Sequence, residues 1–281
     1  VSIGARSVVY WNLADGSTRV LLEDAADARY VEGLGLLFYR GGLLRVVAFD
    51  PDRGETAGVA HALADDLMFG AGGPSPGEMT AVVQYAVGGD ALVYATGGVQ
   101  TAAPGRLEIV SPEGERTPLE VPGGGRGFFG PGVLDANRVL LTRRPDGGAA
   151  LPPGVLDLQR NTFAQLSAES AWYTQPDPTR GRALHAGAAG IRALPLDGSG
   201  GFEWIAGSPV ETAGAALRAY VHRVSPDGRL LALLVNQDET EGDIVFYDLA
   251  GDGGYREFAV TPAAEGYPSF SPDGEWLVYT S

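Results

Sequence analysis

The sequence predicts an all-β fold, a six-bladed β-propeller of four-stranded antiparallel blades, from three observations. A phrase built on Ser-Pro-Asp-Gly and a following apolar run occurs twice, at residues 224–232 and 270–278, about one forty-residue repeat apart. Between the copies, residues 243–249 and 255–260 match two more strands joined by a Gly-rich turn. The 42 glycines and 19 prolines stand mostly between short apolar runs, as turn residues do.

Each part of the repeated phrase has a physical role in a turn. Pro226 and Pro272 preset φ for the first corner of a type I turn, and the Asp after each proline caps its own backbone. The glycine takes the left-handed position that begins a bulged hairpin, so the run after it is a strand. One period therefore holds four short strands, which is typical of a propeller blade that must stack on its neighbours.

The two ends of the chain are predicted to share one blade. The N-terminal residues supply strands at 7–13 and 18–22, and the C-terminal residues supply strands at 267–271 and 275–280. Pairing them closes the ring, leaves no exposed edges there and offsets the loop-closure entropy.

The 281 residues then form a single domain of six blades, about 47 residues each. We expect the first strand of blade 3 at 79–87 and that of blade 5 at 171–175. The predicted blades, from 1 to 6, are 266–281 with 1–24, 27–61, 78–122, 126–168, 170–207 and 218–261.

Composition narrows the classes of partner. The formal net charge of −15 and the pI near 4.5 repel phosphate backbones and anionic lipids, so we expect no nucleic acid partner. All 20 basic residues are arginine, which fits a GC-rich source or a recoded sequence. The absence of cysteine excludes disulfides, thiolate chemistry and cysteine-based zinc sites.

No run approaches the ~20 apolar residues of a membrane span. We therefore expect no membrane contact from these residues. The chain starts without Met and stops directly after a predicted strand, so we expect either a fragment of a longer protein or a processed chain, with any membrane anchor outside these residues.

The repeated phrases resemble those of the TolB-like six-bladed propellers. The resemblance is carried by residues 225–248 and 271–279, with the Ser-Pro-Asp-Gly turn, the apolar strand and the Asp-Ile-x-x-Tyr-Asp-Leu strand. Residues 27–60 also resemble the opening blades of propellers attached to bacterial membrane-bound serine/threonine protein kinases. This second resemblance implies an extracytoplasmic (periplasmic or cell-surface) sensor or interaction domain.

Common catalytic signatures are missing from the sequence. Residues 125–130 fit the Gly-x-Gly-x-x-Gly pattern of dinucleotide sites, but Pro131-Gly132 and a short apolar strand follow in place of a helix, so we predict a turn. A Walker loop is impossible without lysine, and neither a His-Glu-x-x-His pair nor a Gly-x-Ser-x-Gly elbow occurs. We predict no cofactor.

The acidic residues and the histidines have alternative interpretations. An acidic run is predicted in the loop between the second and third strands of blade 6, where we expect solvated side chains, with calcium binding as the alternative. The histidines are His61, His185 and His222, and only His222 falls on a predicted inner strand, where a structural role competes with ligand binding. The acidic run consists of Asp238, Glu239, Glu241 and Asp243.

We predict a non-catalytic module that binds a protein, a peptide or a small molecule at one mouth of the channel. The alternatives are a calcium-dependent lactonase-like hydrolase or the accessory propeller of a serine peptidase. A lactonase needs carboxylate and amide ligands converging in the channel, and no such set is evident. The predicted binding residues at the channel mouth are Tyr30, Trp172, His222, Arg223 and Tyr267.

Overall fold

The computed structural model describes most of the chain. Its strands form six four-stranded antiparallel sheets and one two-stranded ladder, and the six sheets are the blades of a β-propeller, so the predicted fold class is confirmed. One three-residue 3-10 helix, Pro178–Arg180, is the helical element of this part of the chain. The described residues are 6–71, 81–88, 91–96, 106–111, 114–124, 127–144, 152–171, 174–187, 189–207, 218–237, 240–251 and 253–281.

These residues fall into two compact units, of which unit 1 contains three blades. Its sheets have the strand orders β2-β1-β26-β25, β3-β4-β5-β6 and β21-β22-β23-β24. The strands are β1 Val8–Asn12, β2 Thr18–Leu22, β3 Ala26–Val31, β4 Gly35–Arg40, β5 Leu43–Asp50, β6 Glu55–Ala64, β21 Arg218–Val224, β22 Leu230–Gln237, β23 Thr240–Asp248, β24 Tyr255–Ala259, β25 Gly266–Phe270 and β26 Trp276–Thr280.

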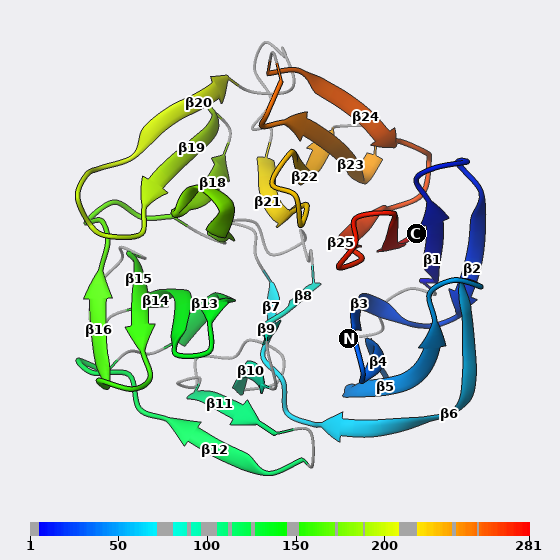
Figure 1. The fold of residues 1–281 in the computed structure, drawn as a ribbon, viewed down its shortest axis with the longest axis horizontal. Helices are drawn as coiled ribbons and strands as arrows, with labels where there is room; N and C mark the ends of the chain where they lie inside the picture. The colour runs from blue at the N-terminus through cyan, green and yellow to red at the C-terminus, as the bar shows by residue number, and fades with distance from the viewer. Residues whose placement is uncertain are drawn as a thin grey trace. The chain divides into compact units, whose positions relative to one another are not determined.

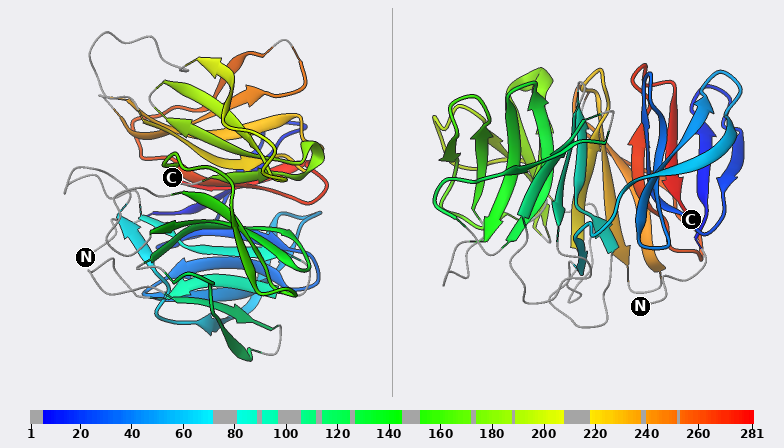
Figure 2. Two further views of the ribbon diagram at one scale, coloured as in Figure 1. Left: turned by 90° about the vertical axis from the view of Figure 1, so that its left-hand side faces the viewer. Right: turned by 90° about the horizontal axis from the view of Figure 1, so that it is seen from below.

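Unit 2 contains the other three blades and the two-stranded ladder. Its four-stranded sheets have the orders β12-β11-β10-β9, β13-β14-β15-β16 and β17-β18-β19-β20, and β13–β16 are drawn in green in Figure 2. The strands are β7 Phe69–Ala71, β8 Ala81–Val83, β9 Tyr85–Gly88, β10 Ala91–Thr96, β11 Arg106–Val110, β12 Arg116–Leu119, β13 Gly127–Asp135, β14 Arg138–Arg144, β15 Pro153–Asp157, β16 Thr162–Gln165, β17 Gln175–Asp177, β18 Arg182–Gly187, β19 Gly190–Pro195 and β20 Glu203–Gly207.

One sheet contains both ends of the chain, as predicted. Strand β1 pairs antiparallel with β26 over five residues, from Val8 opposite Thr280 to Asn12 opposite Trp276. In Figure 1 the dark blue strand β1 and the red strand β25 belong to this sheet. The backbone of Ser7 and Ser281 extends the ladder with two hydrogen bonds of 2.8 and 3.0 Å.

Strand β26 supplies side chains to two hydrophobic cores, because successive residues of a strand point to opposite faces. Trp276 and Val278 belong to the core shared with β3–β6, while Leu277 and Tyr279 belong to the core shared with β21–β24. The Trp276 ring lies 5.3 to 5.6 Å, centroid to centroid, from three neighbouring aromatic rings. These rings belong to Tyr10, Tyr30 and Phe49.

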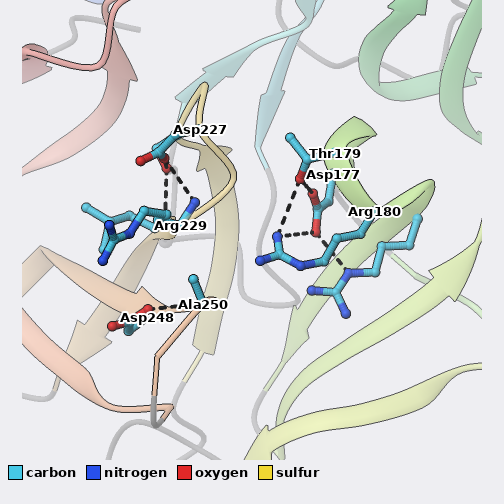
Figure 3. Close-up of polar contacts among 10 residues, drawn as sticks. Asp177, Thr179, Arg180, Asp227, Arg229, Asp248 and Ala250 are labelled. Carbon is cyan, nitrogen blue, oxygen red and sulfur yellow. Dashed lines mark hydrogen bonds and ion pairs between the residues drawn. The ribbon is translucent and has the colours of Figure 1, made fainter.

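The repeated turn forms the same hydrogen bonds in both copies. The Ser225 hydroxyl donates to the Asp227 carboxylate at 2.6 Å and accepts the backbone N–H of Leu230 at 2.8 Å. Asp227 also accepts the backbone N–H of Arg229 at 3.0 Å (Figure 3). In the second copy, the Ser271 hydroxyl donates to the Asp273 carboxylate and accepts the backbone N–H of Trp276. The glycines that end the turns have φ of 73° and 75°, as the sequence predicted.

Two first strands differ from their predictions. The run predicted at 79–87 is divided at Gln84, whose backbone bonds to Met68 and Ala95, so that β8 pairs with β7 and only β9 joins blade 3. In blade 5 the predicted 171–175 strand is wrong, because β17 begins at Gln175 and ends where Pro178 starts the 3-10 helix. Pro178 has no N–H to continue the ladder.

Replacing Trp276 with alanine should test the core around the closing strand. Trp276 is 3% exposed, so Trp276→Ala should lower the free energy of unfolding by about 3–5 kcal/mol. Trp204→Ala is the matched control, because Trp204 is 63% exposed and its loss should cost less than about 1 kcal/mol. If urea denaturation shows that the two variants lose the same free energy of unfolding, the assignment of Trp276 to this core is contradicted.

Candidate functional site

The first strands of the three unit 1 blades are each interrupted by a bulge. The register shifts between Ala26 and Arg29 in β3, between Val221 and Arg223 in β21, and between Gly266 and Ser269 in β25. A bulge re-aims side chains, and bulges are frequent next to binding and catalytic sites.

Two bulge residues adopt a left-handed backbone that their side chains disfavour. Asp27 has φ of 48° and Tyr267 has φ of 55°, and both are buried. A positive φ is uncommon for aspartate and a true outlier for a bulky residue such as tyrosine. Such strain persists only where the surroundings impose it, and it concentrates at functional sites.

His222 lies at the third bulge and faces the Tyr267 ring. The two ring centroids are 5.8 Å apart with the planes at 87°, an edge-to-face contact. His222 as a whole residue is half-buried. Burial lowers the pKa of His222 to about 3, with the positive charges of Arg223 and Arg29 adding to the effect. The ring is therefore neutral at pH 7.

Asp27 and Arg29 form a buried ion pair beside the bulge in β3. The Arg29 guanidinium donates two hydrogen bonds, of 3.1 and 3.2 Å, to the two oxygens of the Asp27 carboxylate. The Arg29 side chain is 12% exposed and the Asp27 side chain is 4% exposed. The Asp27 backbone N–H donates to Thr280 Oγ1 at 3.3 Å. We call Asp27, Arg29, His222, Arg223 and Tyr267 the first-strand cluster.

The predicted binding residues have different locations. His222, Arg223 and Tyr267 fall in the first-strand cluster, with Arg223 near enough to His222 to affect its charge. The Tyr30 ring packs against Phe49 and Trp276 in the core. Trp172 lies outside the described residues.

The acidic run of blade 6 is not confined to a loop. Glu241 and Asp243 lie in β23, because the strand begins at Thr240, and Asp243 is fully buried opposite Val235. Asp238 and Glu239 lie outside the described residues. Within the described ranges, no group of three or more His, Cys, Asp or Glu residues could hold a metal ion.

The remaining motifs have structural locations. The predicted turn at residues 125–130 is wrong for Gly127 and Gly130, which lie in strand β13, while residues 125 and 126 lie outside the described part of the chain. Gly130 donates its backbone N–H to the buried Gln84 side chain at 2.5 Å. His61 is exposed on β6, and the His185 ring lies 6.0 Å from Phe202.

Sequence reasoning missed two polar groups. One is the Asp27–Arg29 pair, for which a bulge gives no sequence signal. The other surrounds the buried Asp177 at the end of β17, which accepts hydrogen bonds from Thr179, Arg180 and Arg182 (Figure 3). Asp177-Pro178 stands where blades 1 and 6 have Ser-Pro, and this substitution was the available signal.

No family model and no curated protein matches this chain. Among solved structures, TolB from Acinetobacter baumannii is similar over 99% of this chain and 63% of its own, with a TM-score of 0.55 at 9% identity. The periplasmic gluconolactonase PpgL of Pseudomonas aeruginosa is similar over 98% of this chain and 89% of its own, with a TM-score of 0.55 at 14% identity. A chain of a nidogen/laminin complex is similar over 88% of this chain and 85% of its own, with a TM-score of 0.54 at 13% identity.

These likenesses establish the propeller fold that the chain shares with TolB. This chain spans less than two thirds of the TolB chain. Identities of this size carry no information on activity. In the described part of the structure, no helix has the length and apolar character needed to cross a membrane.

The lowered pKa of His222 should make the free energy of unfolding depend on pH. Its pKa is about 3 in the folded chain against an ordinary value of 6.5, so between these values the unfolded chain binds the proton and the folded chain does not. Stability should therefore fall as the pH drops through this window. His222→Gln should remove that part of the slope, measured by urea denaturation from pH 4 to 7. An unchanged slope would contradict the neutral assignment.

Proposed function

We propose that this propeller is a non-catalytic binding module and that its ligand contacts the first-strand cluster. The observation that carries the proposal is the coincidence of three bulges, two of them with strained non-glycine residues, on the first strands of adjacent blades in unit 1. The first strands of propeller blades face the central channel, where loops and strand ends commonly bind ligands.

The chemistry of the cluster suits recognition better than proton transfer. A general base works best with a pKa near the working pH, and burial holds the pKa of His222 far below it. The Asp27 carboxylate is tied to Arg29 by two hydrogen bonds. The neutral imidazole offers one donor and one acceptor, and the buried Tyr267 ring packs against it.

We further propose an extracytoplasmic setting, as the sensor or interaction domain of a larger bacterial receptor such as a serine/threonine kinase. The support is the resemblance of residues 27–60 to kinase-attached propellers and the fold shared with TolB and with a periplasmic gluconolactonase. The net charge of −15 favours a protein, peptide or small-molecule ligand over nucleic acid.

A thermal-shift screen tests the binding role. Amino acids, sugars, short peptides, calcium and a chelator are added separately, and a ligand of the cluster should raise the Tm of the wild type. His222→Ala and Arg223→Gln should abolish most of that shift, because they remove groups of the cluster. Arg256→Gln is the control, since Arg256 is exposed on β24 of the same unit.

Two results would contradict the proposal. A shift that survives both cluster variants would place the ligand elsewhere. A large calcium-dependent shift accompanied by lactone hydrolysis would favour the lactonase-like alternative, and hydrolysis assays on the same samples distinguish the two.

A further inference from the structure

Blade 5 presents a tryptophan to solvent on the last strand of its sheet. Trp204 lies on β20, at the end of the strand order β17-β18-β19-β20 (Figure 1), and it is 63% exposed. Of the phenylalanine, tyrosine and tryptophan side chains that the structure describes, it alone is exposed. Burying such a ring removes roughly 150–250 Å² of surface from water, so a partner that covers Trp204 gains what the fold leaves unused.

A bulge in β20 places this tryptophan beside an arginine of β19. The register shifts between Ile191 and Arg192, so that Ile205 is the extra residue and Arg192 pairs with Trp204. Arg192 Cζ lies 5.8 Å from the centroid of the Trp204 ring and 4.3 Å from that of the Phe202 ring. Phe202 packs in turn against the hydrophobic core between blades 4 and 5. The guanidinium is therefore held against two aromatic rings, one of which is anchored in the core.

A carboxylate fixes the same guanidinium from another direction. Arg192 Nη1 donates to Glu169 Oε2 at 2.9 Å, and the two side chains are 21% and 60% exposed, respectively. Within the described residues, the other N–H groups of Arg192, the second oxygen of Glu169 and the indole N–H of Trp204 make no hydrogen bond. The unpaired Arg192 donors are not buried, so a ligand can reach them. We call Glu169, Arg192 and Trp204 the blade 5 patch.

The charges of the blade 5 patch favour a neutral ligand. Arg192 and Glu169 neutralise each other as an ion pair. A cation stacked on Trp204 would meet the positive charge of Arg192 beside the same ring. An anion would meet the exposed Glu169 carboxylate. The ligand that fits this surface combines an apolar face with uncharged groups that donate and accept hydrogen bonds.

We propose that the blade 5 patch binds a neutral saccharide. One face of a sugar ring presents C–H groups with partial positive charge, which pack on the negative face of an aromatic ring such as Trp204. The sugar hydroxyl groups donate and accept hydrogen bonds, which suits the donors of Arg192 and the carboxylate of Glu169. Because Phe202 and Glu169 already hold Arg192 in place, binding costs little side-chain entropy at this residue.

This proposal does not depend on the function proposed for the first-strand cluster. The blade 5 patch belongs to unit 2, whereas the residues of the first-strand cluster belong to unit 1. Substitutions in one set leave the side chains of the other in place, so the two proposals can fail separately.

The test is a titration of the full chain with cellotriose, maltotriose and triacetylchitotriose, followed by NMR of the tryptophan indole N–H groups and by calorimetry. The Trp204 resonance, assigned by its loss in Trp204→Phe, should shift in a saturable manner with a Kd on the order of 1 mM for at least one sugar. Trp204→Ala should weaken binding about tenfold and Glu169→Ala about threefold. Trp204→Phe should retain part of the affinity, because it keeps an aromatic face.

Val59→Ala is the matched control, because Val59 is 77% exposed on β6, the last strand of its own blade, and lies outside the patch. This variant should bind as the wild type does. Circular dichroism verifies that each variant is folded, and the wild-type resonances decide the question if Trp204→Ala is not.

Three results would overturn the proposal. The first is that none of the three sugars shifts the Trp204 resonance of the wild type. The second is that folded Trp204→Ala binds as tightly as the wild type. The third is that tetralysine shifts this resonance while the sugars do not, because the partner would then be a basic peptide.

Discussion

The pairing of β1 with β26 is the constraint on which the rest of unit 1 depends. It joins Val8 to Thr280, residues from opposite ends of the chain, so a large loop-closure entropy must be paid before any of its contacts form. The alternating side chains of β26 offset this cost, because Trp276 and Leu277 enter two different cores. Sheets β3–β6 and β21–β24 each complete a core only when the shared sheet is present. Contacts this distant in sequence are expected to form late in folding.

Much of the fold could be predicted because turn chemistry and strand periodicity are local properties of the sequence. In both copies of Ser-Pro-Asp-Gly the aspartate accepts the backbone N–H two residues further on, as the sequence predicted. The first strands of blades 3 and 5 could not be placed correctly. Gln84 breaks a run that looks continuous, since its backbone bonds to Met68, just before β7, and to Ala95 of β10. Pro178 ends β17 early, but a proline at that position also fits the usual turn.

The candidate site was only partly predictable for a related reason. His222 and Tyr267 were found because they fall on first strands, but the bulges that bring their rings together depend on register. Tyr267 precedes a proline, which interrupts a ladder and gives some indication of a bulge. The bulges at Asp27 and His222 have no such signal in the sequence. Tertiary packing imposes the positive φ of Asp27 and the extra residue at His222, and neither residue type predicts it.

The comparison of equivalent turns shows that blades 5 and 6 connect their first two strands with different residues and a different turn, since blade 5 has the 3-10 helix Pro178–Arg180 there. In both turns a hydroxyl donates to a carboxylate, Ser225 to Asp227 and Thr179 to Asp177, and the order of the two residues along the chain is reversed. The direction decides which side chain is buried. An exposed aspartate adds to the negative surface of the protein, whereas a buried aspartate requires cations beside it, because an unpaired buried charge is costly. The two arginines of blade 5 are those cations, with Arg182 Nε 2.9 Å and Arg180 Nη1 3.3 Å from Asp177 Oδ2.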